Sequence, residues 1–513
     1  MLAACGMLAP LRRAVLPLRR PAPALRRCFG AAVGAAAADA SAADGVSATL
    51  DRLGLDLSRN AGVRDRHGAG ESYHAVQAPD VVVFPRSTEE VVAVVKICNE
   101  RSIPIVPFGT GTSLEGHVAC VRGGVSLDLS KHMVEIDEVN AEDMDCTVQA
   151  GCTRKALNTS LRHTGLEFTV DPGADASIGG MAACGASGTS AVRYGTMREA
   201  VLGLEAVMAD GSVVRTGGRA RKSSAGYDLT RLLVGSEGTL GVITKATLRL
   251  HPLPAFSVAA TCAFPLGSAS KSGLHSAASA VVQMLQAAIP LQKSEVLDVS
   301  TIRAFNAYNP GRAPLPELPH LFLEIGGASE TIVADLAEMA REICDDFGAL
   351  GFEWASGDEE RRRLWEARHS TYYASLALRK DAKGFVTDAC VPLSALADVL
   401  QATAKDVEEM GVVGPIFGHA GDGNCHCILP LRDDDPPEYL ARVHAVNANL
   451  VRRALAAGGS CTGEHGVGLG KIGYLEEQYP PATLLMMRAI KTALDPKNIL
   501  NPGKVLADRG AVA

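Results

Sequence analysis

The first well-patterned part of the chain alternates short apolar runs with a segment of helical periodicity. Val81–Phe84 is an uninterrupted apolar run, which predicts a buried strand. From Thr88 to Arg101 the apolar residues recur at helical spacing, and Ser87 with Glu90 forms a capping-box pattern at the start. Ile103–Pro107 predicts a second short strand. This order of strand, helix and strand opens many nucleotide-binding domains.

A glycine-rich loop, Gly109–Gly116, follows the second predicted strand. A Rossmann fingerprint would need a third glycine at position 114 and then a helix. Leu114 stands at that position, and another strand-like run, Val125–Leu129, follows the loop. Direct binding of a nicotinamide dinucleotide by a Rossmann fold is therefore disfavoured. The small residues and free backbone N–H groups of the loop still suit a pyrophosphate, although ordinary turns share this composition.

Two further segments are rich in small residues. Asp171–Met181 runs on into Gly185–Gly188, and Val234–Thr244 places another glycine turn before a strand-like run. Gly, Ala and Ser leave little side chain to build a core, and a flat ring system lying against the backbone would explain the composition. A tightly packed, glycine-rich helix start is the alternative interpretation.

Two histidines flank an Asp-Gly pair later in the chain. Asp-Gly is a favoured two-residue hairpin turn. If Asp422 and Gly423 form that turn, His419 lies opposite His426 on one side of the hairpin, with Cβ atoms about 5 Å apart. Such a pair could hold one metal ion between the imidazoles, or it could simply satisfy hydrogen bonds within the hairpin.

Composition and charge exclude several classes of protein. Of 513 residues, 47% are hydrophobic and 21% are charged, so the chain can form a large core. It has no apolar stretch of about 18 residues, which excludes a membrane-spanning helix. The 13 cysteines are scattered, without a CxxC pair or a secretory signal, and we expect reduced thiols.

The N-terminus is basic and contains no acidic residue before Asp39. Together with its alanine-rich composition, this predicts a mitochondrial transit peptide, with a disordered basic tail as the alternative. Loss of its six arginines would change the formal net charge from −7 to −13, and so acidic a chain is a poor nucleic-acid binder. The six are Arg12, Arg13, Arg19, Arg20, Arg26 and Arg27.

From about residue 75 to Leu506 the chain resembles the flavin-binding oxidoreductases of the vanillyl-alcohol-oxidase type, and within them the cytochrome-linked mitochondrial dehydrogenases of D-2-hydroxy acids. Seven segments in the family's order carry this resemblance. They are Pro107–Gly116, Val170–Gly188, Arg193–Arg198, Leu233–Thr244, Gly418–Cys427, Thr462–Gly470 and Asn501–Lys504.

The resemblance implies an α+β protein with two main domains. It gives a two-subdomain, PCMH-type FAD-binding domain over 75–254, preceded by the predicted transit peptide over 1–38 and a helical lead-in over 39–74. An α+β substrate or cap domain with an antiparallel sheet spans 255–460. The segment 461–513 returns to complete the flavin and metal site.

The resemblance also implies FAD as the cofactor. Because close relatives need no covalent attachment, we expect FAD to be bound non-covalently, even though His117 adjoins the phosphate loop. The residues implied in FAD binding are Pro107, Gly109, Thr110, Gly111, Thr112, Ser113, Gly116, Pro172, Gly173, Ser177, Gly179, Gly180, Ser187, Gly188, Tyr194, Glu237, Gly238, Ile243 and Asn501.

A metal and two catalytic residues follow from the same resemblance. It places Glu464 beside His419 and His426 as a third metal ligand, a set that suits Zn²⁺ or Mn²⁺. His465 matches the family's catalytic histidine and would accept the hydroxyl proton. Arg368 matches the arginine that binds the substrate carboxylate.

The implied reaction is oxidation of D-lactate, or a related D-2-hydroxy monocarboxylic acid, to the 2-oxo acid. Relatives that use D-2-hydroxyglutarate carry a lysine where this chain has Val386, which argues for a short or aliphatic substrate tail. A D-2-hydroxyglutarate or glycolate dehydrogenase and a non-catalytic flavin-binding subunit are the alternatives. Cytochrome c, a quinone or an electron-transfer flavoprotein would accept the electrons, in the matrix or at the inner membrane.

Overall fold

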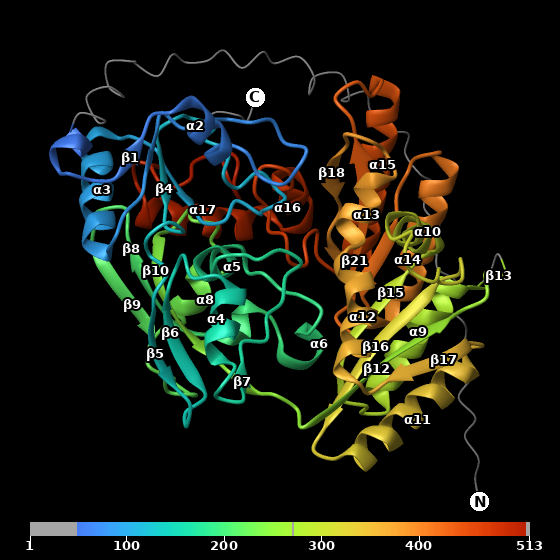
Figure 1. Cartoon of the computed structure of the whole chain (residues 1–513). Coiled ribbons are helices and arrows are strands. Elements are labelled where there is room, and N and C mark those ends of the chain that lie inside the picture. The colour runs from blue at the N-terminus through green and yellow to red at the C-terminus, as the bar shows by residue number, and fades with distance from the viewer. Residues whose placement is uncertain (1–48, 269–270, 509–513) are drawn as a thin grey trace, which may run out of the picture.

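The computed structural model describes residues 49–268 and 271–508, so the predicted transit peptide lies outside the described residues. Figure 1 shows an N-terminal part, in blue to green, beside a second part in yellow and orange. The C-terminal helices, in red, lie back against the N-terminal part. Within the described residues, no helix is both long and apolar enough to cross a membrane.

The first sheet carries the predicted strand–helix–strand unit. Its strand order is β1-β2-β4-β3, with β2, β4 and β3 parallel. Helix α3 begins after Ser87, whose Oγ accepts a hydrogen bond from the Glu90 N–H at 3.4 Å. The predicted helical lead-in also contains a strand, because β1 pairs with β2 at the sheet edge. The elements are β1(Leu57–Ser58), α2(Ala61–His67), β2(Val81–Val83), α3(Thr88–Arg101), β3(Ile105–Phe108) and β4(Val125–Asp128).

A second, antiparallel sheet completes the N-terminal part, in the order β5-β6-β10-β8-β9. Its apolar face packs against α4 and α5 through Leu157, Met181 and Ala246. The strands are β5(Ile136–Asn140), β6(Asp145–Gln149), β8(Val201–Val207), β9(Val213–Gly217) and β10(Val242–Arg249), with β7(Leu166–Glu167) and β11(His251–Pro252) paired separately. The helices are α4(Arg154–Leu161), α5(Ile178–Cys184), α6(Ala191–Tyr194), α7(Met197–Ala200) and α8(Leu229–Leu233).

The second part is built on an eight-stranded antiparallel sheet. Its order is β17-β12-β16-β15-β20-β21-β18, and β19 also pairs with β21. The strands are β12(Phe256–Ala263), β15(Leu291–Leu297), β16(His320–Gly327), β17(Leu350–Ala355), β18(Lys383–Val386), β19(Ala389–Cys390), β20(Ile416–His419) and β21(Asn424–Leu431), with a small ribbon of β13(Gly267–Ser268) and β14(Lys271–Ser272).

Helices cover both faces of this sheet. One face packs on α9, α11, α14 and α15 in a large apolar core that includes Leu323, Leu396 and Leu450. The other face packs on α10, α12 and α13 through Ile302, Trp365 and neighbouring residues. These helices are α9(Gly273–Gln286), α10(Val299–Tyr308), α11(Glu330–Asp346), α12(Asp358–His369), α13(Thr371–Ala377), α14(Leu393–Glu409) and α15(Pro437–Ala456).

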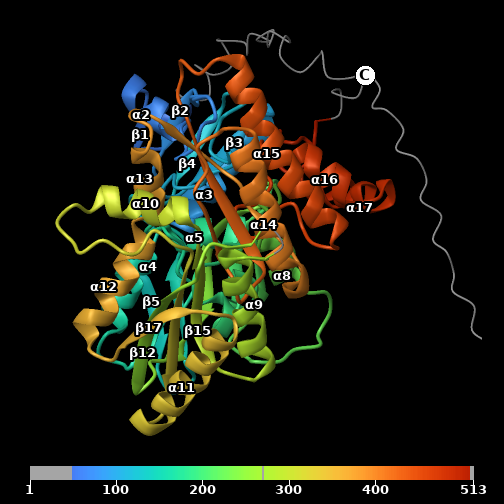
Figure 2. The same ribbon diagram turned by 90° about the vertical axis from the view of Figure 1, so that its right-hand side faces the viewer.

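The end of the chain returns to the N-terminal part. Helices α16(Ile472–Gln478) and α17(Pro481–Leu494) lie beside it in both views (Figures 1 and 2). Leu500 forms a parallel bridge with Ile105 in the first sheet. The Asn501 side-chain N–H donates to the backbone oxygens of His117 at 3.2 Å and Glu237 at 2.8 Å. The 462–470 segment reaches the N-terminal part as well, because the N–H groups of Val467 and Gly468 donate to the Glu237 carboxylate at 2.6 and 2.8 Å.

Candidate flavin and metal site

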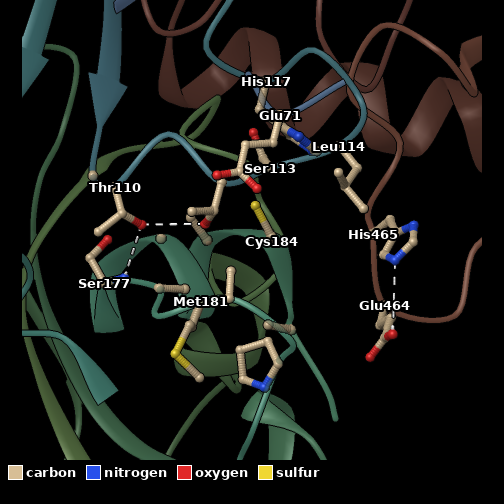
Figure 3. Close-up of a pocket in the computed structure, with 18 of the residues that line it drawn as sticks. Glu71, Thr110, Ser113, Leu114, His117, Ser177, Met181, Cys184, Glu464 and His465 are labelled. Carbon is tan, nitrogen blue, oxygen red and sulfur yellow. Dashed lines mark hydrogen bonds and ion pairs between the residues drawn. The ribbon is translucent and has the colours of Figure 1, made fainter. Parts of the chain in front are cut away.

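One cavity joins the glycine-rich loops of the N-terminal part to strands β18, β20 and β21 of the second part. Figure 3 shows Thr110 and Ser177 on one side of the cavity and Glu464 with His465 on the other. Nearly all residues that the resemblance implies in FAD binding line it. They are Pro107, Gly109, Thr110, Gly111, Thr112, Ser113, Pro172, Gly173, Ser177, Gly179, Gly180, Ser187, Gly188, Glu237, Gly238, Ile243 and Asn501.

Two of the residues implied in FAD binding, Tyr194 and Gly116, do not line this cavity. Tyr194 points its hydroxyl at the second part, where it donates to Gln292 Oε1 at 2.9 Å. Gly116 turns the chain at φ +75°, and a Cβ there would lie 3.1 Å from a methyl carbon of Leu469. Both residues contact other elements of the chain, and their implied role in FAD binding stays a prediction.

The glycine loop fits a flat, phosphate-bearing cofactor. Gly111 has φ +72°, and a Cβ at Gly109 would lie 2.1 Å from Ser177 Oγ, so side chains are excluded where the two loops meet. The Thr110 hydroxyl accepts from the Ser177 N–H at 3.4 Å. Ser113 Oγ is buried and has no hydrogen-bond partner among the described residues. The loops thus offer backbone and an unpaired hydroxyl to a ligand, as FAD would require.

His419 and His426 project from neighbouring strands of one hairpin, but not in the predicted register. Phe417, and not His419, lies opposite His426, because the loop contains Ala420 to Gly423 instead of a two-residue turn. Contacts of this loop hold the longer turn: the Gly421 N–H donates to Ser294 Oγ at 2.9 Å. The two histidines still share a face, with ring centroids 5.4 Å apart.

Both imidazoles are anchored through Nδ1. The Nδ1–H of His419 donates to the carboxylate of Glu295, and that of His426 donates to the backbone oxygen of Thr387 at 3.1 Å. Each ring therefore aims Nε2 at the same carboxylate oxygen of Glu464, at 3.2 Å from His419 and 3.1 Å from His426. Metal-ligating histidines typically donate their other ring N–H to a carboxylate or a backbone oxygen in this way.

The electrostatics of this cluster favour a cation. Burial lowers the pKa of His419, but the carboxylates of Glu295 and Glu464 outweigh it and hold that pKa well above the usual 6.5. The two carboxylates therefore favour positive charge here, from a proton or from a divalent ion. Two imidazole nitrogens and one carboxylate oxygen that converge with an open cavity beside them suit a catalytic metal.

Glu295 is a site residue that the sequence analysis missed. It lies on β15, its side chain is fully buried, and its Oε2 accepts from the Arg368 Nε–H at 2.6 Å. The guanidinium of Arg368 also lies over the Phe417 ring, 4.5 Å from the centroid. Arg368 thereby lines the cavity as a fixed cation beside the histidine and glutamate cluster. No local motif marks Glu295, because it acts only through partners distant in sequence.

His465 lines the cavity beside the metal-ligand candidates (Figure 3). Its ring stacks on His426 at 5.1 Å between centroids, and its Nε2 is 3.8 Å from Glu464 Oε1. Its buried Nδ1 has no hydrogen-bond partner within the described part of the chain. Burial lowers the pKa of His465 below its usual 6.5, which keeps the ring neutral and able to accept a proton near pH 7.

An apolar wall stands next to Arg368. It is formed by Val386 on β18, Phe417 on β20 and Ile428 on β21, and all three line the cavity. The nearby lysine of β18, Lys383, is turned away, since its Nζ bonds to Asp433 at 2.8 Å on the surface.

Comparison with known proteins identifies the class of protein that this fold and cavity define. The family described as "FAD binding domain" matches residues 79–217, and "FAD linked oxidases, C-terminal domain" matches residues 262–505. The chain belongs to the FAD-linked oxidases. It is an FAD-dependent oxidoreductase with a PCMH-type FAD-binding domain, as the sequence predicted.

Similar proteins narrow this class. The chain is 50% identical to "Probable D-lactate dehydrogenase, mitochondrial" of Danio rerio, over 88% of this chain and 89% of the relative. It is 43% identical to "D-lactate dehydrogenase [cytochrome], mitochondrial" of Arabidopsis thaliana, over 86% of this chain and 76% of the relative. The structure of 4-ethylphenol oxidase from Gulosibacter chungangensis shares the fold, with TM-score 0.71 and 20% identity over 92% of this chain and 98% of that one. The protein is a mitochondrial FAD-linked oxidoreductase.

Proposed function

We propose that the protein is a mitochondrial D-lactate dehydrogenase that uses non-covalent FAD and a divalent ion, Zn²⁺ or Mn²⁺, and yields pyruvate. One observation carries the proposal. A single cavity presents Arg368, the His419–His426–Glu464 cluster and His465 next to glycine-rich loops that fit a flavin. We also propose 254 and 460 as the limits of the FAD-binding and cap domains, with 461–513 completing the site.

Arg368 would bind the substrate carboxylate. Its Nε is engaged by Glu295, and its remaining guanidinium nitrogens make no hydrogen bond to another described residue. They can donate two parallel hydrogen bonds to a carboxylate, which fixes both the position and the tilt of the substrate.

The hydroxyl end of the substrate would meet His419, His426, Glu464 and His465. A divalent ion held by the first three would lower the pKa of the substrate hydroxyl. His465 then accepts the hydroxyl proton, because its ring is neutral, close to this cluster and unpaired at Nδ1. FAD, when bound, supplies the acceptor for the hydride of the α-carbon.

The same anchor points select the D-enantiomer and a monocarboxylate. Arg368 fixes the carboxylate and His465 fixes the hydroxyl, so exchanging enantiomers turns the α-hydrogen away from the flavin side of the cavity. Val386, Phe417 and Ile428 offer only apolar surface to the substrate tail. A distal carboxylate would lose water there without gaining a charged partner.

The test is anaerobic reduction of the bound flavin by a panel of D- and L-2-hydroxy acids, followed by absorbance. We expect fast reduction by D-lactate and slightly longer aliphatic D-2-hydroxy acids, and little by the L-acids or D-2-hydroxyglutarate. Preference for the diacid or for glycolate would assign one of the alternative dehydrogenases. A flavin that no member of the panel reduces would indicate a non-catalytic flavin-binding subunit.

We further propose a cytochrome as electron acceptor, in line with the name of the Arabidopsis thaliana relative. Turnover with D-lactate should reduce cytochrome c directly. If reduction requires an added quinone or an electron-transfer flavoprotein, that carrier is the acceptor instead.

A further inference from the structure

Asp388 binds the loop that carries both Glu464 and His465. A single oxygen of its fully buried carboxylate, Oδ2, accepts from the backbone N–H groups of Gly463 at 2.8 Å, Glu464 at 3.0 Å and His465 at 2.9 Å. The Thr462 hydroxyl donates to the same oxygen at 2.6 Å. Successive N–H groups that converge on one anion form a nest, which fixes the backbone dihedrals of the residues that contribute them.

A buried lysine links this arrangement to the flavin side of the cavity. Lys471 Nζ lies 3.3 Å from Asp388 Oδ2 and 3.2 Å from Glu115 Oε1, and only 2% of its side chain is exposed. Glu115 belongs to the 109–116 loop, and its backbone oxygen accepts from the Leu469 N–H at 2.7 Å. The cation therefore neutralises one carboxylate from each side of the cavity and joins the two loops.

Asp388 itself has no access to a substrate. It is absent from the cavity lining, whereas Glu464 and His465 are part of that lining. The Asp388 carboxylate also lies near nitrogens of His426 and His465, and its Oδ1 is buried without a hydrogen-bond partner among the described residues, so Asp388 holds the 462–465 loop through Oδ2 alone.

We propose that Asp388 is a positioning residue, which sets the metal ligand Glu464 and the base His465 relative to His426 and, through Lys471, relative to the flavin loop. The inference rests on the proposed function of these two residues. Partners behind metal ligands typically contribute about 10- to 100-fold in metal affinity or activity, and we expect an effect of that size here.

The test compares Asp388→Asn with Asp495→Asn in the FAD-loaded protein. Asp495 is a matched control in the same C-terminal segment, because it also accepts from two consecutive N–H groups, Ile499 at 3.0 Å and Leu500 at 2.8 Å, and from a lysine, Lys491 at 2.6 Å. Four quantities are measured: the thermal midpoint, the flavin spectrum, the Kd for Zn²⁺ or Mn²⁺ after chelation, and the rate of flavin reduction by saturating D-lactate.

We expect both variants to melt at lower temperature and to retain the flavin spectrum. Only Asp388→Asn should weaken metal binding and slow flavin reduction, each by about 10- to 100-fold. Its apparent Kd for D-lactate should change far less than its rate, since Arg368 is untouched. Wild-type metal affinity and rate in Asp388→Asn, or equal losses in Asp495→Asn, would overturn the proposal and leave a purely structural role.

A milder variant keeps the test decisive if Asp388→Asn does not fold. Thr462→Val removes one donor to Oδ2 and preserves the charge, and we expect a smaller loss in the same two quantities. No loss in either quantity would overturn the positioning role. The proposed function is judged separately: wild-type flavin reduction by His465→Ala would contradict it, whatever the Asp388 variants do.

Discussion

The Nε–H of Arg368 donates to the buried carboxylate of Glu295 across 2.6 Å. The second oxygen of that carboxylate accepts from His419 Nδ1. One side chain of β15 therefore orients both the guanidinium of Arg368 and the imidazole of His419, a candidate metal ligand. The proposed sites for the substrate carboxylate and for the ion are thus tied to a common support. Their separation is set by strand β15 and its pairing with β20.

Replacing Glu295 by Gln should loosen both sites together. The amide has one acceptor oxygen, so either Arg368 or His419 would face its NH₂ group instead. We expect about 10- to 100-fold weaker binding of Zn²⁺ or Mn²⁺ and a raised KM for D-lactate, measured by metal titration and by steady-state kinetics. Glu324→Gln, which removes the partner of Lys293 on the adjacent strand, is the control and should change neither quantity.

Removal of the His465 imidazole should stop proton transfer but not substrate binding. We expect His465→Ala to reduce its flavin at least ~10²-fold more slowly than the wild type in stopped-flow experiments, the lower range for a general base. The exposed His163 provides the control, and His163→Ala should behave as the wild type. An unchanged rate in His465→Ala would show that the proton is accepted elsewhere.

Removing the metal should show that the metal and FAD bind independently. Because the His419–His426–Glu464 cluster lies apart from the glycine loops, chelation should abolish turnover while the flavin absorbance persists. His419→Ala and His426→Ala should have the same effect. Restoring activity with Zn²⁺ or Mn²⁺ in turn identifies the ion that functions, and full activity in a demonstrably metal-free sample would refute the metal assignment.

Substrate choice should depend on Val386. Introducing a cation by Val386→Lys should raise kcat/KM for D-2-hydroxyglutarate relative to D-lactate, since the distal carboxylate would gain a partner in the cavity. Lys383→Ala is the control: Lys383 pairs with Asp433 outside the cavity and should leave this ratio unchanged. If the wild type prefers the diacid and Lys383→Ala abolishes that preference, our substrate assignment is wrong.

Acid should release the flavin. His117 lines the cavity, with its Nε2 only 3.0 Å from the buried Glu237 Oε2, which crowds that nitrogen against attachment of a flavin. After acid precipitation we expect FAD in the supernatant and a colourless pellet. Flavin fluorescence that stays with the denatured chain in gel electrophoresis would indicate a covalent bond.

Local pattern accounted for most of the first sheet of the N-terminal part. Apolar runs and a helix cap predicted β2, α3, β3 and β4. This works because the buried residues of a helix and those of a strand recur at different spacings along the sequence. The hairpin shows the limit of this reasoning. Strand side chains alternate with period two, so the predicted turn put both histidines on the correct face, although Phe417 and not His419 lies opposite His426.

What the sequence determined by itself is therefore most of the first sheet, the glycine-rich loops and, through family motifs, many of the residues that line the cavity. The tertiary structure alone revealed Glu295, a carboxylate without a local motif, and the partners of Asp388. The partners of both carboxylates lie on strands or loops far along the chain. A buried charge is stable only where folding brings donors around it, so its role is decided by the assembled fold and not by its neighbours in sequence.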